Sequence, residues 1–377
     1  MIIYCYFLYP FFLGLVARYR YRPVHKSLFQ PTISILMAVY NEEDVIERKI
    51  KNLLTLDYPQ DKMEILIASD GSTDETNAIA KKFTDKRLHF FENNVRRGKI
   101  KTIQGLVQRA KNDILVFNDA RQLMAPDAVK QLVDNFADVT VGCASGELIF
   151  LEANEGTAQG INLYWRYEKY IRGLESRLHS MMGATGAIYA IRRELYPEVP
   201  SHVILDDMFI PFKIIQKGYR AIYDETAKAY DEVANDPKEE HRRKARTLFG
   251  NYQLFTMMPQ MFNPFRSPIA IQLFSHKFLR LMVPFLMIFL FFINALWLRE
   301  GIYKGIWRLQ FIFYTMALIG GLARNHSYGI LKGVVRLCYI PYVFCLLNFS
   351  ALVGFFRFIF HRQEVTWEKA RERASHI

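Results

Sequence analysis

Three apolar segments near the C-terminus constrain this chain more than any other feature of its sequence. Residues 279–298 and 337–356 each supply about 20 mostly apolar residues, the length that a helix needs to cross the hydrocarbon core of a bilayer. Residues 309–323 have the same character but form a shorter segment. We therefore predict about three transmembrane helices within residues 276–360, followed by a charged tail at residues 361–377.

The N-terminal segment is apolar and aromatic as well. Residues 1–17 lack a cationic start and a small-residue cleavage site, which favours a membrane anchor over a removed signal peptide. We assign residues 1–26 to this anchor and to its basic flank, which contains Arg18, Arg20 and Arg22. Positive charge after an anchor holds the following domain on the cytoplasmic side. The sequence thus predicts an integral protein of the plasma (inner) membrane whose largest domain is cytoplasmic.

The predicted topology contains a conflict. One span before the large domain and three after it would place the basic tail at residues 361–377 on the outer side of the membrane. That arrangement opposes the positive-inside rule. Either one apolar segment lies in the interface or re-enters the bilayer, or the rule does not hold for this chain.

The formal net charge of +12 has to be explained by a partner or by the membrane. Basic residues cluster beside the apolar segments, as at Arg336 and Arg357, and no nucleic-acid-binding motif accompanies them. We expect membrane lipids as partners and no nucleic acid. The four cysteines show no metal or redox spacing, so we expect neither a disulfide nor a zinc site.

Short apolar runs alternate with helical stretches in the first half of the large domain. The runs are residues 33–39, 64–69, 88–92 and 113–118, and the stretches between them have helical apolar spacing. This alternation predicts parallel strands joined by crossover helices, an α/β domain that we assign to residues 27–239. Such a sheet binds ligands beyond the C-terminal ends of its strands.

Acidic and turn-forming residues follow three of these strands. They form the segments Tyr40-Asn41-Glu42-Glu43, Asp70-Gly71-Ser72-Thr73-Asp74 and Asp119-Ala120-Arg121, which we expect on one rim of the sheet. Each segment alone is explained by turns and helix caps. No GxGxxG or GxxxxGK[ST] motif is present, which argues against a dinucleotide enzyme and a P-loop NTPase.

A basic stretch links the α/β domain to the apolar segments. Within residues 240–275, the run RRKAR at 242–246 is followed by aromatic residues and methionines. This order favours interfacial amphipathic helices that press one face into the lipid head groups. An ordinary basic surface helix is the alternative.

Taken in order, these motifs resemble those of a known family. The stretches SILMAVYNEEDVI, EILIASDGSTDET and VFNDA, followed by ATGAIYAIRREL, VILDDMF and RRKAR, resemble family 2 glycosyltransferases. The similarity is to the membrane-bound synthase branch, which includes cellulose, chitin and hyaluronan synthases, and it spans roughly residues 30–260. It implies a GT-A fold: a Rossmann-like nucleotide-binding sheet with flanking helices, here joined to transmembrane helices.

The resemblance assigns a donor site. It implies that Asp70 contacts the uracil ring of a UDP-sugar and that Asp119, as the first acid of a DxD element, positions a Mg²⁺ or Mn²⁺ ion on the diphosphate. Arg121 replaces the second acid, but substrate phosphates and water can complete the shell of such an ion. The residues expected to contact the nucleotide sugar are Ala38, Tyr40, Glu42, Asp70, Lys99, Asp119, Arg243 and Arg246.

The resemblance also assigns the chemistry. Asp207, beside Asp206, matches the acid that serves the family as general base, a group able to take the proton of a sugar hydroxyl. Two adjacent acids also repel, which raises the pKa of one of them. The alternative is that both acids only favour the N-terminus of a helix.

Two further elements concern the leaving group and the acceptor. Arg243 and Arg246 suit the charge of a departing nucleoside diphosphate, and they stand where processive synthases carry Q-x-x-R-W. Gln and Trp are absent here, which puts processive chain growth in doubt.

The small residues Gly183, Ala184 and Gly186 would let the backbone approach an acceptor or donor sugar, or would simply form a tight turn. Aromatic and acidic residues at 164–175 either line a sugar path or pack as an amphipathic helix.

We therefore predict an inverting transfer of a hexose or N-acetylhexosamine from a UDP-sugar to a membrane-associated lipid or polysaccharide acceptor. A processive polysaccharide synthase is the alternative within this class. A sugar nucleotidyltransferase would carry a glycine-rich loop after the first strand, where this chain has YNEED. An inactive membrane protein that only binds nucleotide sugars is the non-enzymatic alternative.

Overall fold

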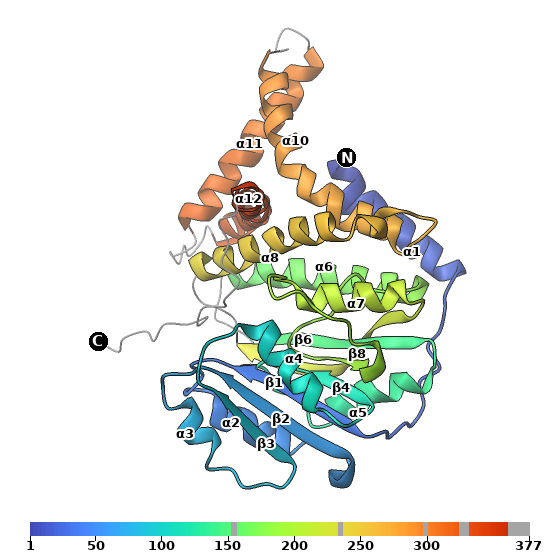
Figure 1. Ribbon diagram of the computed structural model, residues 1–377. Coiled ribbons are helices and arrows are strands. Elements are labelled where there is room, and N and C mark those ends of the chain that lie inside the picture. Colours follow the sequence, from blue (N-terminus) through green and yellow to red (C-terminus); the bar gives the residue numbers. More distant parts are fainter. Residues whose placement is uncertain (152–156, 233–236, 297–300, 324–331, 361–377) are drawn as a thin grey trace.

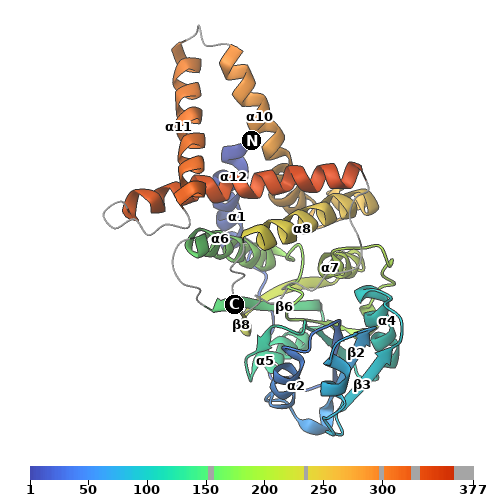
Figure 2. The same ribbon diagram turned by 90° about the vertical axis from the view of Figure 1, so that its left-hand side faces the viewer.

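The computed structural model describes residues 1–151, 157–232, 237–296, 301–323 and 332–360 (Figure 1). An α/β domain forms one end of the molecule, and helices α10 and α11 rise from the other end. Helices α6 and α8 lie between these two parts in both views (Figures 1 and 2). The predicted charged tail at 361–377 lies outside the described residues.

The α/β domain is built on one eight-stranded sheet with the order β3-β2-β1-β4-β7-β6-β8-β5. The first four strands are β1 (Ile33–Val39), β2 (Met63–Asp70), β3 (Leu88–Asn93) and β4 (Ile114–Phe117). β1 pairs in parallel with both β2 and β4, and β2 pairs in parallel with β3. The predicted parallel sheet is thereby confirmed in this half of the domain.

The other half of the sheet is mixed. It consists of β5 (Leu123–Met124), β6 (Val141–Leu151), β7 (Tyr189–Arg192) and β8 (Arg220–Glu232). β7 is antiparallel to both β4 and β6, whereas β6 and β8 run parallel with two register shifts. The junction of β4 with β7 brings the turn before β7 close to the rim of the parallel half.

Alternation along β1 explains why helices cover both faces of the sheet. Ile33, Ile35 and Met37 belong to one hydrophobic core, and Leu36 belongs to the other. Because successive strand side chains point to opposite faces, a strand that is apolar throughout must be covered on both sides. The first core includes α2 (Ile46–Leu54) and α5 (Ala128–Val133), and the second includes α4 (Lys99–Arg109) and α7 (Asp206–Gln216).

The remaining elements complete the domain and its connection to the N-terminus. They are η1 (Tyr4–Leu8), α1 (Tyr9–Tyr19), η2 (Gln60–Lys62), α3 (Thr76–Ala80), η3 (Asp134–Ala137), α6 (Thr157–Leu178), η4 (Arg193–Leu195), α8 (Pro237–Met257), η5 (Pro259–Phe262) and α9 (Ala270–Gln272). Helix α1 packs on α6 through Leu13 and Ala17, which contact Ile171 and Leu174. The N-terminal segment is therefore attached to α6.

Three helices in the described residues are long and apolar enough to cross a membrane: Ala270–Leu296, Gly301–Ala323 and Leu337–Ile359. They comprise η6 (Leu273–Phe278) with α10 (Leu279–Leu296), α11 (Gly301–Ala323) and most of α12 (Lys332–Ile359). This confirms the predicted number of candidate spans. Their arrangement was not predicted. Helix α12 lies across the base of the α10–α11 pair and is seen end-on in Figure 1 and lengthwise in Figure 2.

Close contacts fix α12 in this position. Gly354 approaches α8 so tightly that a Cβ atom there would lie 3.0 Å from the backbone nitrogen of Phe249. The ring of Tyr252 on α8 also stacks against the ring of Phe358, with centroids 6.0 Å apart. Helix α12 is thus packed along α8 and crosses the direction of the other two apolar helices.

Candidate active site

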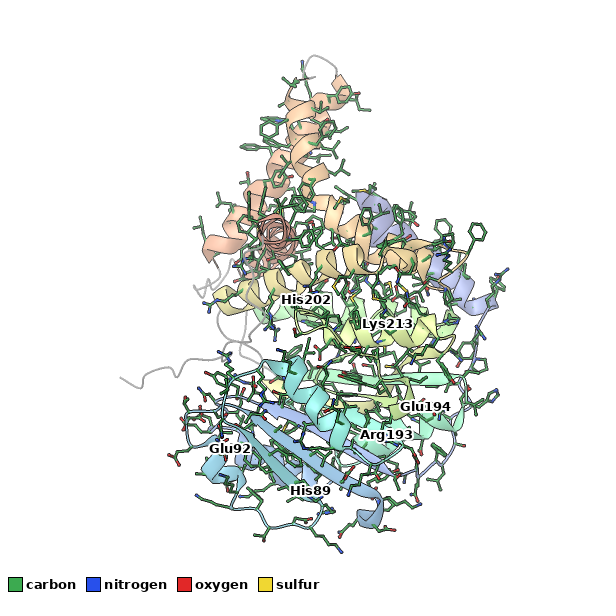
Figure 3. The ribbon with its side chains drawn as sticks, viewed as in Figure 1. His89, Glu92, Arg193, Glu194, His202 and Lys213 are labelled. Atoms are coloured by element: carbon green, nitrogen blue, oxygen red, sulfur yellow. The ribbon has the colours of Figure 1, made fainter. Side chains whose placement is uncertain are left out.

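A cavity of 1640 Å³ extends from the sheet rim to α12, and every predicted site residue except Asp70 lines it. These residues are Ala38, Tyr40, Glu42, Lys99, Asp119, Gly183, Ala184, Gly186, Asp206, Asp207, Arg243 and Arg246. The charged side chains labelled in Figure 3, such as Glu194 on η4 and Lys213 on α7, are not part of its lining. The fold therefore brings segments that are far apart in the sequence to one place.

The loops after β1 and β2 are locked together. The backbone nitrogen of Asn41 donates to Ser72 Oγ at 3.1 Å, and that of Glu43 donates to Asp74 Oδ2 at 3.2 Å. The ring of Tyr40 is covered by the guanidinium of Arg96, whose Cζ atom lies 3.9 Å from the ring centroid. These contacts give the end of the cavity at the sheet rim a fixed wall.

Asp70 does not line the cavity. Its side chain is fully buried, and its carboxylate accepts hydrogen bonds from the backbone nitrogens of Arg97 and Gly98, at 2.8 and 2.9 Å. The hydroxyl of Thr102 donates to the same carboxylate at 2.9 Å. These hydrogen bonds hold the loop before Lys99 in place, and the contact of Asp70 with a uracil ring stays a prediction.

Lys99 lies among carboxylates at the centre of the site. Its Nζ atom is 3.0 Å from Asp119 Oδ1 and 3.9 Å from Asp206 Oδ2. Burial alone would lower the pKa of Lys99, but the charges of Asp119 and Asp206 outweigh it and raise this pKa above its ordinary value. The ammonium group therefore stays charged and can face an anionic substrate.

Arg121 is committed to a neighbouring acid. Its Nε atom donates to Glu42 Oε1 at 3.2 Å, so the position that lost the second acid of DxD now carries an ion pair. Among the described residues, no group of three or more His, Cys, Asp and Glu side chains is arranged to hold a metal ion. Asp119 is 41% exposed and faces the cavity. These groups fit an ion that takes most of its ligands from a bound diphosphate and water.

Asp207 stands in the first turn of α7 and combines burial with nearby negative charge. Burial, followed by the carboxylates of Asp206 and Asp119, raises the pKa of Asp207 to about 7, although Lys99 acts in the opposite direction. A carboxylate with such a pKa is matched to accepting a proton near neutral pH. The predicted rise in the pKa of one of the two adjacent acids thus belongs to Asp207.

The turn before β7 passes between the acids. A Cβ atom at Gly186 would lie 3.6 Å from Asp119 Oδ2 and 3.6 Å from Asp207 Oδ2. The backbone nitrogen of Ala184 donates to the carbonyl oxygen of Asp207 at 2.7 Å, which ties the turn to α7. Because glycine has no side chain, the space between the two carboxylates stays open for a reacting group.

Helix α8 brings basic residues to the opposite wall. Arg243 and Arg246 line the cavity, and Lys244 lies over the ring of Trp165, with its Nζ atom 4.6 Å from the centroid. Trp165 and Tyr164 also line the cavity from α6. The basic run and the aromatic helix of the sequence therefore face each other across one space.

The comparisons with known proteins agree with this geometry. Residues 34–199 match the sequence profile described as Glycosyl transferase family 2, which covers the β1 to β4 rim and the turn at Gly186. This part of the chain is similar to glycosyl transferase family 2. The resemblance drawn from the motifs is thereby confirmed, and the mixed sheet with its flanking helices is a GT-A fold.

Two curated proteins similar to this chain are bacterial. Poly-beta-1,6-N-acetyl-D-glucosamine synthase of Staphylococcus aureus (strain MSSA476) is 28% identical over 204 residues, which are 52% of this chain and 48% of the relative. Probable glycosyltransferase YdaM of Bacillus subtilis (strain 168) is 24% identical over 261 residues, 66% of this chain and 62% of the relative. The chain thus spans about half the length of the first relative.

A solved structure resembles the whole fold. The mannosyltransferase PcManGT from Pyrobaculum calidifontis, in complex with GDP-Man and Mn²⁺, aligns with a TM-score of 0.68 and 21% identity. The alignment covers 95% of this chain and 96% of that protein. The likeness therefore extends through the C-terminal helices.

Two residues were not predicted, one that lines the cavity and one buried beside it. Arg172 on α6 lines the cavity and donates from Nη1 to Thr185 Oγ1 at 2.6 Å, which steadies the turn before β7. Lys49 on α2 is completely buried, and its Nζ atom donates to the carbonyl oxygen of Gln122 at 2.5 Å. Burial lowers the pKa of Lys49 to about 7, while the charge of Asp119 opposes this shift. Neither residue belongs to a motif, and only the folded chain brings them to the site.

Proposed function

We propose that this enzyme transfers a hexose or N-acetylhexosamine, with inversion, from a UDP-sugar to a hydroxyl of a membrane-associated acceptor. The observation that carries the proposal is the cluster around Gly186. The carboxylates of Asp119 and Asp207 both face this point, and Lys99 lies beside Asp119. A donor phosphate group and an acceptor hydroxyl can thus be held on two sides of one sugar ring.

In this proposal Asp207 is the general base. The acceptor oxygen attacks the anomeric carbon, its proton passes to Asp207, and the bond from the anomeric carbon to the diphosphate oxygen breaks. One displacement inverts the anomeric centre and needs no nucleophile from the enzyme. The pKa of about 7 lets Asp207 accept the proton and release it again near neutral pH.

Cationic residues of the chain serve the leaving group. Lys99 faces the cavity beside Asp119, and Arg243 and Arg246 line it from α8. Fixed positive charge stabilises the negative charge that develops on the diphosphate as the bond breaks. A Mg²⁺ or Mn²⁺ ion beside Asp119 would neutralise part of the same charge. The solved mannosyltransferase, which is in complex with GDP-Man and Mn²⁺, supports testing both ions.

The donor nucleotide has a second candidate. The solved mannosyltransferase carries GDP-Man, whereas the named product of the Staphylococcus relative is a polymer of N-acetyl-D-glucosamine. We favour a UDP-sugar, and a donor screen has to include GDP-mannose. A processive polysaccharide synthase remains the alternative reaction, supported by the name of that relative and disfavoured by the altered RRKAR motif.

The test measures the released nucleoside diphosphate for wild type and Asp207→Asn over a panel of UDP-sugars and GDP-mannose. We expect turnover of one donor, loss of that turnover in the variant, and unchanged binding of the nucleoside diphosphate by calorimetry. Binding without turnover in the wild type, with acceptors present, would support the inactive binding protein instead. Product length on a defined acceptor separates single transfer from chain growth.

A further inference from the structure

The cavity has two ends with different chemistry. Beside the sheet rim its lining includes the exposed charged residues Asp44, Arg48 and Arg242. Beneath α12 its lining is mostly apolar. The apolar side chains there are Phe7, Ile340, Val343, Phe344, Leu347 and Ala351, and Asn348 and Arg357 of α12 line the same part. A nucleotide sugar accounts for the charged end, and the apolar end calls for a different ligand.

The apolar end reaches the molecular surface between η1 and α12. Phe7 on η1 is 70% exposed and Ile340 on α12 is 53% exposed, although both side chains line the cavity. Behind them the rings of Tyr6 and Phe344 meet edge to face, with centroids 5.2 Å apart. The opening at this place is therefore bordered by apolar side chains from two elements.

The wall formed by η1 is firmly held. Tyr4 Oη lies 2.8 Å from Ser275 Oγ, and the guanidinium of Arg280 lies over the ring of Tyr6 at 5.0 Å. Arg280 also forms an ion pair with Glu168 of α6. These contacts connect η1 to η6, α10 and α6, so that the border of the opening has a fixed shape.

The arrangement of the apolar helices places this opening at the membrane surface. Helices α10 and α11 rise away from the α/β domain, α12 lies across their base, and the N-terminus ends well short of their far end (Figures 1 and 2). Apolar side chains are strongly exposed on the rising pair, as at Phe292 and Leu309, and also on α12, as at Leu337 and Phe349. Exposed apolar surface of this extent is suited to lipid. With α10 and α11 crossing the bilayer, α12 lies in the plane of its interface.

We propose that the acceptor is a membrane lipid with a hydroxyl-bearing head group, which enters sideways through the opening between η1 and α12. Its chain stays against the apolar side chains of α12, and its head reaches the space at Gly186. The inference rests on the proposed function, because the lipid hydroxyl is the oxygen that attacks the anomeric carbon and gives its proton to Asp207. A lipid phosphate already lacks that proton and would leave Asp207 without a role.

A growing saccharide fits this end of the cavity less well. Sugar chains are bound through hydrogen bonds and aromatic faces. Asn348 and Phe344 of α12 offer one of each, but the other side chains of α12 in this part, Ile340, Val343, Leu347 and Ala351, offer neither. An acyl chain in contact with these side chains removes apolar surface from water at about 25 cal/mol per Å². The chemistry of the lining therefore favours an amphiphile over a soluble or polymeric acceptor.

The test uses the full chain in nanodiscs and measures nucleoside diphosphate release from the donor found in the screen. Three acceptor conditions are compared: dioleoylglycerol in the disc, a hexadecyl glycoside in the disc, and soluble cello- and chito-oligosaccharides. Val343→Trp and Leu347→Trp fill the apolar end of the cavity. Leu337→Trp is the matched control, because Leu337 is exposed on the same helix and is not part of the lining.

We expect at least one of the two lipids, and neither class of oligosaccharide, to raise release above the acceptor-free rate. The two filling variants should lose this increase and keep the acceptor-free rate, and Leu337→Trp should keep both. If a tryptophan variant fails to fold, Ala351→Leu fills the same space with a smaller side chain. Stimulation by oligosaccharides equal to that by lipid, no stimulation by either lipid, or lipid stimulation that survives the filling variants would overturn the inference. Absence of release with every donor under all three acceptor conditions would instead contradict the proposed function.

Discussion

Replacing Asp207 by asparagine should stabilise the protein at the same time as it removes activity. The carboxylate is held among like charges and away from bulk water, and its pKa rises from 3.8 to about 7. Asparagine has almost the same shape but carries no charge. The substitution therefore removes an unfavourable interaction from the folded state and leaves the packing of α7 in place.

The size of the effect follows from the shift in pKa. One pKa unit corresponds to about 1.4 kcal/mol, so the whole shift corresponds to about 4 kcal/mol. The side chain of Asp207 keeps partial access to the cavity, and Lys99 offsets part of the repulsion. We therefore expect the substitution to raise the free energy of unfolding by about half of this value, about 2 kcal/mol. For a domain of this size that gain should raise Tm by about 4 to 8 °C.

The stabilisation by Asp207→Asn should depend on pH. Between about pH 4 and pH 7 the folded protein keeps a proton on Asp207 that the unfolded chain has already lost. The free energy of unfolding of the wild type therefore falls as pH rises through this window, and it stays low above pH 7. The free energy of unfolding of Asp207→Asn does not fall in this way. The Tm of the variant should therefore exceed that of the wild type by the full amount near about pH 8 and by little near about pH 4.5.

The assay is thermal unfolding of both proteins in the same detergent at these two pH values. Glu194→Gln, which removes an exposed carboxylate of η4 away from the cavity, is the matched control and should leave Tm unchanged. An equal Tm for wild type and Asp207→Asn at both pH values would refute the reasoning, because it would mean that the acid is neither buried nor repelled in the folded protein.

Three further predictions concern the reaction. Gly186→Ala places a methyl group 3.6 Å from the carboxylate oxygens of Asp119 and Asp207 without a steric clash, so kcat/KM should fall about tenfold or more with little change in Tm. Asp206→Asn removes one cause of the raised pKa of Asp207, so the acidic limb of the pH profile of kcat/KM should move to lower pH; an unchanged midpoint would speak against this coupling. Arg121→Asp adds a second carboxylate near Asp119, so the Mn²⁺ concentration for half-maximal activity should fall, and an unchanged value would argue against an ion at Asp119.

Local sequence patterns were sufficient to predict the parallel half of the sheet. β1, β2 and β4 are short, continuously apolar runs that end in turn-forming residues, a pattern that fits strands buried on both faces. β8 was not predicted, because its 13 residues mix charged and apolar side chains and its pairing with β6 contains register shifts. Strands of that kind depend on partners that are distant in the sequence.

Motif positions located the site but not the direction of each side chain. Asp70 follows β2 as expected, yet its carboxylate turns to the backbone of Arg97 and Gly98, a loop that no local pattern connects with it. Lys49 sits in a helical stretch with amphipathic spacing, where a lysine is expected to face solvent, and it is completely buried instead. Both outcomes depend on contacts between loops and helices that meet only in the folded domain.

No sequence pattern predicted the orientation of α12 either. Its composition is that of a spanning helix, and residues 337–356 were predicted as one. The close approach of Gly354 to α8 and the stacking of Tyr252 against Phe358 are tertiary contacts that hold it crosswise. An in-plane α12 offers a resolution of the topology conflict, because it leaves one fewer span after the catalytic domain.

The central claim is that Asp207 acts as the base in transfer from a nucleotide sugar. The most direct measurement is the rate of nucleoside diphosphate release in nanodiscs, with Mn²⁺ and the acceptor lipid, for wild type beside Asp207→Asn. We predict a loss of about 10² to 10⁴-fold in kcat for the variant, with the affinity for the nucleoside diphosphate unchanged. Turnover by Asp207→Asn at the wild-type rate would contradict the account.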